Sequence, residues 1–355
     1  MIPANPLLGI AFHAVGAISA ALCYTPQKAT RFWSWQTYWL AQASVCWIIL
    51  PVLVAWLTIP EIGTVLSLAP RGAMVHAFLL GALYGVGGTA FGLAIRHIGF
   101  SLTYAVAIGI SCVLGTLVPP LLSGQLLLIF EKTGASWVLS GIAIGVLGIL
   151  VSGWAGRLKE LDLAAQGGVS TGFDLRRGLP LVILAGVLSA VYGMALAAGQ
   201  PIADEAARHG AGVFQGNIIY IFSNSGAFLT TALYSLWLHT KHKTLGEYVE
   251  LPGGTEKSAL ARNFAMALLT GCLWYGQFFF YGLGHVRMGS YEFSSWAIHM
   301  ILLVLFSAFS GLFLREWSGC RPRTWMTLGL AIGVLIAAVL VLTYGNFLGD
   351  AVAGH

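Results

Sequence analysis

The sequence predicts an all-α integral membrane protein with ten transmembrane helices, and three observations support this fold class. Of the 355 residues, 57% are hydrophobic and 9% are charged, whereas about 25% of the residues in a soluble domain are charged. Apolar runs of about 20 residues, enough to cross roughly 30 Å of hydrocarbon, recur along the chain, as in residues 179–199 and 325–344. The lysines and arginines lie almost entirely in short segments between these runs. A chain of this composition cannot cover its apolar surface in water.

Each transmembrane helix is expected where an apolar run is long enough to span the bilayer. In the first half of the chain these helices are predicted at residues 6–24, 36–58, 73–95, 101–122 and 135–154. In the second half they are predicted at residues 178–199, 213–238, 260–283, 290–314 and 325–346.

The positive charges predict the orientation of these spans. The loops after the odd-numbered spans hold fourteen of the eighteen lysines and arginines, and the other four are Arg71, Lys132, Arg208 and Arg287. By the positive-inside rule, the loops after odd-numbered spans face the cytoplasm and both termini face the periplasm. Because the cations lie in separate short loops and form no patch, the pI near 9.0 does not indicate a nucleic-acid partner.

The two halves of the chain share a weak internal similarity. The segment GAISA at 16–20 resembles GVLSA at 186–190, and the surroundings of Tyr84 resemble those of Trp274. These matches predict a first five-helix repeat at residues 1–156, a cytoplasmic linker at 157–177 and a second repeat at 178–355. Because five is odd, the second repeat enters the membrane inverted, as in many secondary transporters. The alternative is that short matches of small residues arise in membrane spans by chance.

A helical hairpin at residues 271–300 is too polar and aromatic for a plain lipid anchor. Trp274, Gln277 and Tyr281 share one helical face, together with His285. Flat rings on this face can stack on a sugar while the amide bonds its hydroxyl groups, so we predict that these three residues bind substrate. Tyr84 corresponds to Trp274 in the first repeat, so we predict that it binds substrate as well.

Ionisable groups inside spans are costly and are therefore candidates for function. His13 and His299 lie at a similar predicted depth, and Glu292 shares a predicted helical face with His299. We predict that the two histidines bind substrate and that all three residues couple transport to protons. The alternatives are a structural histidine bonded to a carbonyl group for His13, and for Glu292 an acid that is solvated or paired with Arg287 at a helix N-terminus.

A stripe of amides and aromatics runs along the predicted seventh span. Asn217, Tyr220 and Asn224 follow helical spacing, and uncharged amides suit a neutral polyol. We therefore predict that both asparagines bind substrate, with interhelical hydrogen bonding as the alternative.

The sequence lacks the motifs of several enzyme classes. It contains no GxxxxGK[ST], HExxH, GxSxG or CxxC, and its five cysteines have no metal-ligand spacing. We expect neither a cofactor nor a metal, and transport driven by a proton gradient rather than catalysis. An intramembrane enzyme that uses the same histidines and glutamate as acid and base is the alternative, and the oligomeric state stays open.

Several long motifs run through most of the chain. They include Phe12-His13, Tyr24-x-Pro26, Trp33-Ser34-Trp35, Trp47-Ile48-Ile49-Leu50-Pro51, Leu158-Lys159-Glu160, Trp274-Tyr275-x-Gln277, Ser295-Trp296-x-x-His299-Met300 and Glu316-Trp317. These motifs closely resemble those of the bacterial L-rhamnose-proton symporter family, within the drug/metabolite transporter superfamily. The resemblance implies ten spans, a bacterial inner-membrane location, periplasmic termini and uptake of a neutral sugar, L-rhamnose, with a proton.

Three positions depart from the family pattern that this resemblance implies. Residues 87–91 replace an asparagine-rich segment, Glu292 stands in place of an aspartate, and Gln200 stands in place of a lysine. The change at Glu292 keeps a titratable carboxylate. The loss of the amides leaves a related deoxyhexose, a pentose or another neutral metabolite as the alternative substrate.

Overall fold

The computed structural model describes residues 4–166, 174–251 and 257–353, and every regular element in these residues is a helix. The short elements are the α-helices α4 (Ile62–Leu68) and α7 (Leu126–Glu131) and the 3-10 helices η1 (Pro26–Ala29), η3 (Gly212–Ile218), η4 (Leu245–Tyr248) and η5 (Gly289–Ser294). The long segments are α1 (Pro6–Leu22), the continuous run of α2 (Trp35–Ser44), η2 (Val45–Ile49) and α3 (Leu50–Thr58), α5 (Arg71–Ile98), α6 (Phe100–Leu122), α8 (Ala135–Ala165), α9 (Leu175–Arg208), α10 (Ile219–His242), α11 (Lys257–His285), α12 (Ser295–Phe313) and α13 (Pro322–Ala353).

Nine segments of the described chain are long and apolar enough to cross a membrane. They coincide with nine of the ten predicted spans, so the helices fit a multi-pass integral membrane protein. α10, which covers most of the predicted span 213–238, is not among the nine. Its apolar run is interrupted by Ser223, Asn224 and Ser225, which lower its hydropathy.

The helix α8 is longer than the sequence predicts. It continues through Ala165, so the predicted linker at 157–177 is helical over its first part, and residues 167–173 lie outside the described chain. Arg157 and Glu160 form an ion pair of 3.3 Å at helical i,i+3 spacing. The charges that indicate the end of the hydrocarbon region therefore do not end the helix.

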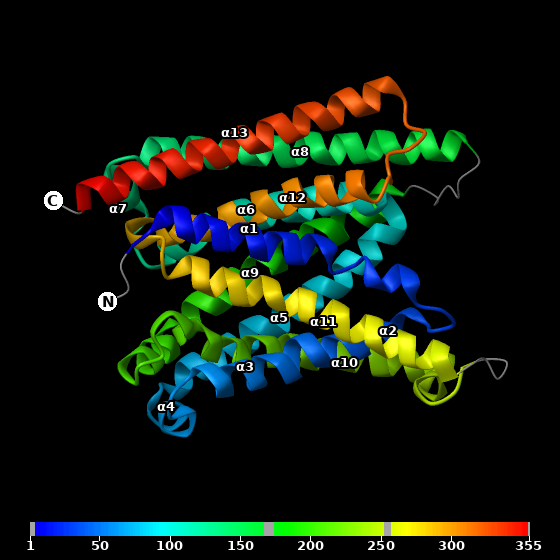
Figure 1. Ribbon diagram of the computed structural model, residues 1–355, viewed down its shortest axis with the longest axis horizontal. Coiled ribbons are helices and arrows are strands. Elements are labelled where there is room, and N and C mark those ends of the chain that lie inside the picture. The colour runs from blue at the N-terminus through cyan, green and yellow to red at the C-terminus, as the bar shows by residue number, and fades with distance from the viewer. Residues whose placement is uncertain (1–3, 167–173, 252–256, 354–355) are drawn as a thin grey trace. The chain divides into compact units, whose positions relative to one another are not determined.

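The chain divides into two compact units, and each unit takes segments from both halves of the sequence. Unit 1 comprises residues 1–21, 87–194 and 283–355, and unit 2 comprises 22–86 and 195–282. α5, α9 and α11 each contribute residues to both units. Within unit 1, α13 lies along α8, and α12 packs against α6 (Figure 1). Within unit 2, α10 packs against α2, η2 and α3.

Glycines allow close helix packing within each unit. In unit 1, a Cβ atom at Gly141 of α8 would lie 2.6 Å from Leu342 Cγ of α13. In unit 2, Gly226 of α10 faces the backbone of α5 so closely that a Cβ atom would overlap the Phe78 carbonyl group. Small residues at these crossings let the backbones approach, as expected of packed membrane helices.

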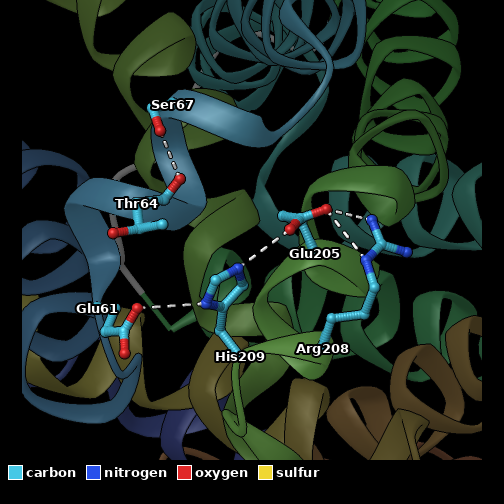
Figure 2. A network of polar contacts seen from close by, with 6 residues as sticks. All are labelled: Glu61, Thr64, Ser67, Glu205, Arg208 and His209. Atoms are coloured by element: carbon cyan, nitrogen blue, oxygen red, sulfur yellow. Dashed lines mark hydrogen bonds and ion pairs between the residues drawn. The ribbon is translucent and has the colours of Figure 1, made fainter.

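A polar network in unit 2 joins the segment before α4 to the end of α9. Figure 2 shows His209 between the carboxylates of Glu61 and Glu205, with Arg208 on the other side of Glu205. His209 Nε2 lies 3.2 Å from Glu205 Oε1, and its Nδ1 lies 3.5 Å from Glu61 Oε2. The Glu205 side chain is 11% exposed and that of Glu61 is 68% exposed, so Glu205 is the central acid of the network.

We expect Glu205→Gln to lower the thermal unfolding midpoint, because charge-assisted hydrogen bonds to the Glu205 carboxylate are lost. The matched variant Glu61→Gln removes an exposed partner and should cost about 0.5 kcal/mol or less. Thermal unfolding of the purified protein in detergent measures both variants. Equal midpoints for the two would contradict the central position of Glu205.

Candidate functional site

His13 of α1 and His299 of α12 form a buried pair within unit 1. Their ring centroids lie 6.0 Å apart with an interplanar angle of 66°. His13 is fully buried and His299 is 2% exposed. The sequence predicts a similar depth in the membrane for His13 and His299, and in the structure the two rings approach each other directly. Two imidazolium ions at this separation repel by about 3 kcal/mol at an effective dielectric constant of about 20, so simultaneous protonation of both rings is disfavoured.

The position of His13 depends on a close approach between α1 and the end of α11. A Cβ atom at Gly284 would lie 2.8 Å from the Gly9 carbonyl oxygen and 3.0 Å from His13 Nε2. The guanidinium group of Arg287 lies 5.5 Å from the centroid of the Phe12 ring, and the backbone N–H of Asn5 donates to the Arg287 carbonyl group at 2.9 Å. These contacts anchor the first half of α1 and fix the depth of His13.

The end of α11 and the segment that follows it carry two further titratable side chains. His285 Nδ1 lies 3.1 Å from Ser295 Oγ, which joins the end of α11 to the start of α12. Glu292 lies in η5 and is exposed, whereas Ser295 and His299 are buried in α12. The structure thus differs from the single face predicted for Glu292 and His299. A 3-10 turn has 3.0 residues per turn, so the face of α12 does not continue through η5.

Trp274 and three aromatic side chains of unit 2 that contact it form a cluster of four rings, which we call the Trp274 cluster. The Trp274 ring is approached edge-on by Tyr24 at 5.4 Å, Trp39 at 5.5 Å and Trp47 at 5.8 Å between centroids. Tyr84, the predicted repeat counterpart of Trp274, lies 6.3 Å from Trp47. Edge-to-face pairs of this kind hold the rings in defined orientations.

Three buried N–H groups of unit 2 have no hydrogen-bond acceptor in the described chain. They are Trp47 Nε1 and Trp274 Nε1 in the Trp274 cluster, and Gln42 Nε2. Gly271, one turn before Trp274, brings α11 against α2, since a Cβ atom there would lie 3.1 Å from the Gln42 carbonyl oxygen. A buried donor without an acceptor costs about 1–3 kcal/mol. A ligand with several hydroxyl groups could offer the acceptors that these donors need.

The π-helical turn η2 lies within the helix that carries Gln42 and Trp47. It covers Val45–Ile49, and the Cys46 carbonyl group in it accepts a hydrogen bond of 3.5 Å from Asn224 Nδ2 of α10. π-Helical turns are rare and occur frequently at functional sites. The turn changes the angle between the residues before and after it, and both Gln42 and Trp47 are buried.

The other predicted binding residues lie in unit 2. Tyr281 of α11 is buried and Gln277 is half-buried. Asn217 Nδ2 donates to Thr58 Oγ1 at 3.0 Å, and Asn224 bonds to η2 as described. The hydroxyl group of Tyr220, on the same stripe, donates to the Phe278 carbonyl group at 2.6 Å. These bonds favour the helix-packing alternative for this stripe, in which Asn217 lies in η3 and the other two residues lie in α10.

Helical periodicity in the sequence does not identify Gln42, Trp39 or Trp47 as binding residues. Gln42 is an amide within an apolar run, and it lies one helical turn after Trp39, so this polar position was a signal on the sequence. The π-helical turn, which sets the angle between Gln42 and Trp47, has no counterpart in simple 3.6-residue periodicity.

The arrangement offers binding and proton-holding groups but no metal-ligand cluster. Within residues 4–166, 174–251 and 257–353, no group of three or more His, Cys, Asp or Glu side chains is placed to hold a metal ion. Aromatic rings with buried donors suit a neutral hydroxylated ligand, and an imidazole pair can take up and release one proton.

Comparison with known proteins identifies the family. Residues 3–346 match the family model described as L-rhamnose-proton symport protein. A protein from Mannheimia succiniciproducens named L-rhamnose-proton symporter is 34% identical over 345 residues, which is 96% of this chain and 98% of that protein. Proteins of the same name are 34% identical in Cronobacter sakazakii, over 94% of this chain and 96% of theirs, and 32% identical in Escherichia coli K12, over 96% and 98%. The chain therefore belongs to the L-rhamnose-proton symport protein family.

Proposed function

We propose that this chain imports L-rhamnose together with a proton by alternating access. The observation that carries the proposal is the family match over residues 3–346, and relatives at 32–34% identity bear the symporter name over nearly their full length. The family name describes transport rather than chemical conversion, so the protein is a transporter and not an enzyme.

We place sugar recognition at the Trp274 cluster and Gln42. The indole N–H groups of Trp47 and Trp274 and the Gln42 amide donate to sugar hydroxyl oxygens, and the rings contact the apolar C–H groups. Tyr84, Gln277 and Tyr281 remain predicted contributors from the same unit. Asn217 and Asn224 contribute to binding only if sugar displaces their present partners.

We place proton coupling at the pair His13 and His299, with Glu292 as the second candidate because it is an exposed carboxylate. A single proton on the pair changes the charge of a buried region, and such a change favours one conformation of a transporter over another. The two histidines also remain predicted to contact the sugar.

We propose ten spans, with α10 as the seventh, in two inverted repeats at 1–156 and 178–355 joined by residues 157–177. The compact units support this arrangement, because unit 2 takes residues 22–86 from one half and 195–282 from the other, which are corresponding stretches of the predicted repeats. The charge distribution supports periplasmic termini in a bacterial inner membrane.

Uptake into proteoliposomes tests the proposed function. A gradient of one pH unit, acid outside, supplies about 1.4 kcal/mol per proton, enough for about a tenfold accumulation of L-rhamnose at one proton per sugar. We expect accumulation to collapse with a protonophore and the sugar to be recovered chemically unchanged. A related deoxyhexose or a pentose that accumulates in place of L-rhamnose would correct the substrate, and conversion of the sugar would favour an enzyme.

A further inference from the structure

A cavity of about 110 Å³ lies in unit 1, between α6, α8 and α12. Residues of two sequence motifs without a role in the proposed function meet at it: Lys159, in the last third of α8, and Glu316-Trp317, shortly after α12. The positive-inside rule places this end of unit 1 on the cytoplasmic side. The cavity is separate from the histidine pair, since neither His13 nor His299 lines it.

The charged groups at the cavity already neutralise each other. Lys159 Nζ lies 3.3 Å from Glu316 Oε2, and it also lies over the Trp317 ring at 4.8 Å from the centroid. Glu160 does not take part in this pair. Its carboxylate accepts a hydrogen bond of 3.2 Å from the backbone N–H of Ser101, at the start of α6. Since Lys159 and Glu316 form a neutral pair, an ionic ligand would gain little net attraction here.

The remaining wall carries four hydroxyl groups among small and aliphatic residues. Ser101 and Tyr104 from α6, Ser152 from α8 and Ser307 from α12 line the cavity, and Tyr104 OH lies 3.5 Å from Ser307 Oγ. Trp317 is 6% exposed, and its indole N–H has no hydrogen-bond acceptor in the part of the chain that the structure describes. Hydroxyl groups both donate and accept, so this wall complements a ligand that does the same.

The size and the openness of the cavity set the size of the ligand. A closed cavity of about 150 Å³ holds a benzene molecule, so the present space accommodates much of a six-membered ring. Lys159 and Glu316 are 18% and 32% exposed, so they lie at the mouth, where part of a ligand can extend outward. An aromatic wall with a few polar groups is typical of ligand pockets.

We propose that this cavity is a second binding site, on the cytoplasmic side, for a neutral hydroxyl-rich ligand of monosaccharide size. The carboxylate of Glu316 and the serine hydroxyls accept from ligand hydroxyl groups, while Lys159 and the Trp317 indole donate to them. The choice of L-rhamnose as this ligand rests on the proposed function, because the transported sugar leaves the protein on that side.

Protection of Lys159 from acylation tests the site. The full-length protein in detergent is treated with an amine-acylating reagent, with and without L-rhamnose, and the modified peptides are measured by mass spectrometry. At about ten times the dissociation constant, L-rhamnose should slow acylation of Lys159 about tenfold by mass action. Lys241, which lies over Trp237 in unit 2, provides the internal control in the same spectrum and should react at an unchanged rate.

Two variants of α12 make the test specific. Ser307→Leu fills the cavity and should abolish the protection, whereas Ser310→Leu, one turn further along the same helix and outside the cavity lining, should retain it. If Ser307→Leu does not fold, Ser152→Leu fills the same space from α8. Protection that persists in a folded cavity-filling variant would overturn the proposal, and so would unprotected Lys159 in a wild-type protein that transports the sugar.

A third variant separates this site from the proposed transport site. Trp274→Ala should lose sugar uptake and keep the protection of Lys159. Loss of protection in this variant would show that Lys159 responds to the transport site and would overturn a separate cavity site. Protection by L-rhamnose in a wild-type protein that fails to transport it would reject the proposed function and leave the second site standing.

Discussion

Trp274→Phe is expected to raise the L-rhamnose concentration for half-maximal uptake about tenfold, with a nearly unchanged maximal rate. The phenylalanine ring keeps the edge-on contacts with Tyr24, Trp39 and Trp47 but removes the buried indole N–H, which has no acceptor in the described chain. One hydrogen bond to a sugar hydroxyl oxygen contributes about 1.4 kcal/mol, which corresponds to this factor of ten. Initial rates of proton-driven uptake in proteoliposomes measure it.

A tryptophan outside the cluster supplies the control for this prediction. Trp56 of α3 is 65% exposed, so Trp56→Phe should leave both kinetic constants unchanged. Gln42→Leu, which removes a second buried donor of unit 2, should behave like Trp274→Phe. Unaltered sugar dependence in both Trp274→Phe and Gln42→Leu would place sugar recognition outside the Trp274 cluster.

His299→Gln is expected to uncouple sugar movement from proton movement. Glutamine keeps hydrogen-bonding capacity but cannot carry a proton near neutral pH, so a single titratable ring would remain in a pair whose centroids are 6.0 Å apart. Exchange of labelled for unlabelled L-rhamnose across the membrane should continue, while accumulation driven by a pH gradient should fall to the level without a gradient. Acidification of the vesicle lumen on addition of sugar, reported by a trapped pH-sensitive dye, should disappear.

His76→Gln is the matched control, because His76 is an exposed histidine of α5 in unit 2. It should accumulate sugar like the wild type. Glu292→Gln distinguishes the two coupling candidates. If it abolishes proton entry while His299→Gln leaves proton entry intact, coupling lies at the carboxylate of η5 and the role assigned to the histidine pair is wrong.

Hydropathy and charge predict much of this fold, because the apolar runs and the basic loops are physical requirements of a bilayer. Nine predicted spans coincide with helices long and apolar enough to cross a membrane among the described residues. The helix boundaries were less predictable, and α8 shows why. The charged residues Arg157, Lys159 and Glu160 mark the end of hydrocarbon, but they are also good helix formers.

The candidate site was only partly predictable, because periodicity identifies a helical face but not the face that it meets. The depth estimate placed His13 and His299 at a similar level, and the structure brings the rings together. Trp274 was selected for its own face, whereas its neighbours Trp39 and Trp47 come from a helix more than 200 residues earlier in the chain. Such a pairing depends on tertiary packing, which a single sequence does not encode locally.

The π-helical turn at Val45–Ile49 is, in effect, one residue inserted into an otherwise regular helix. Deleting a residue there would rotate everything before it by about 100° relative to everything after it, since an α-helix has 3.6 residues per turn. Gln42 would then turn away from the side on which Trp47 lies. In an alignment of family members, a gap placed at this turn therefore changes which residues of one protein are matched to which residues of another. Chimeras between members should exchange residues 35–58 as one block, with the turn intact.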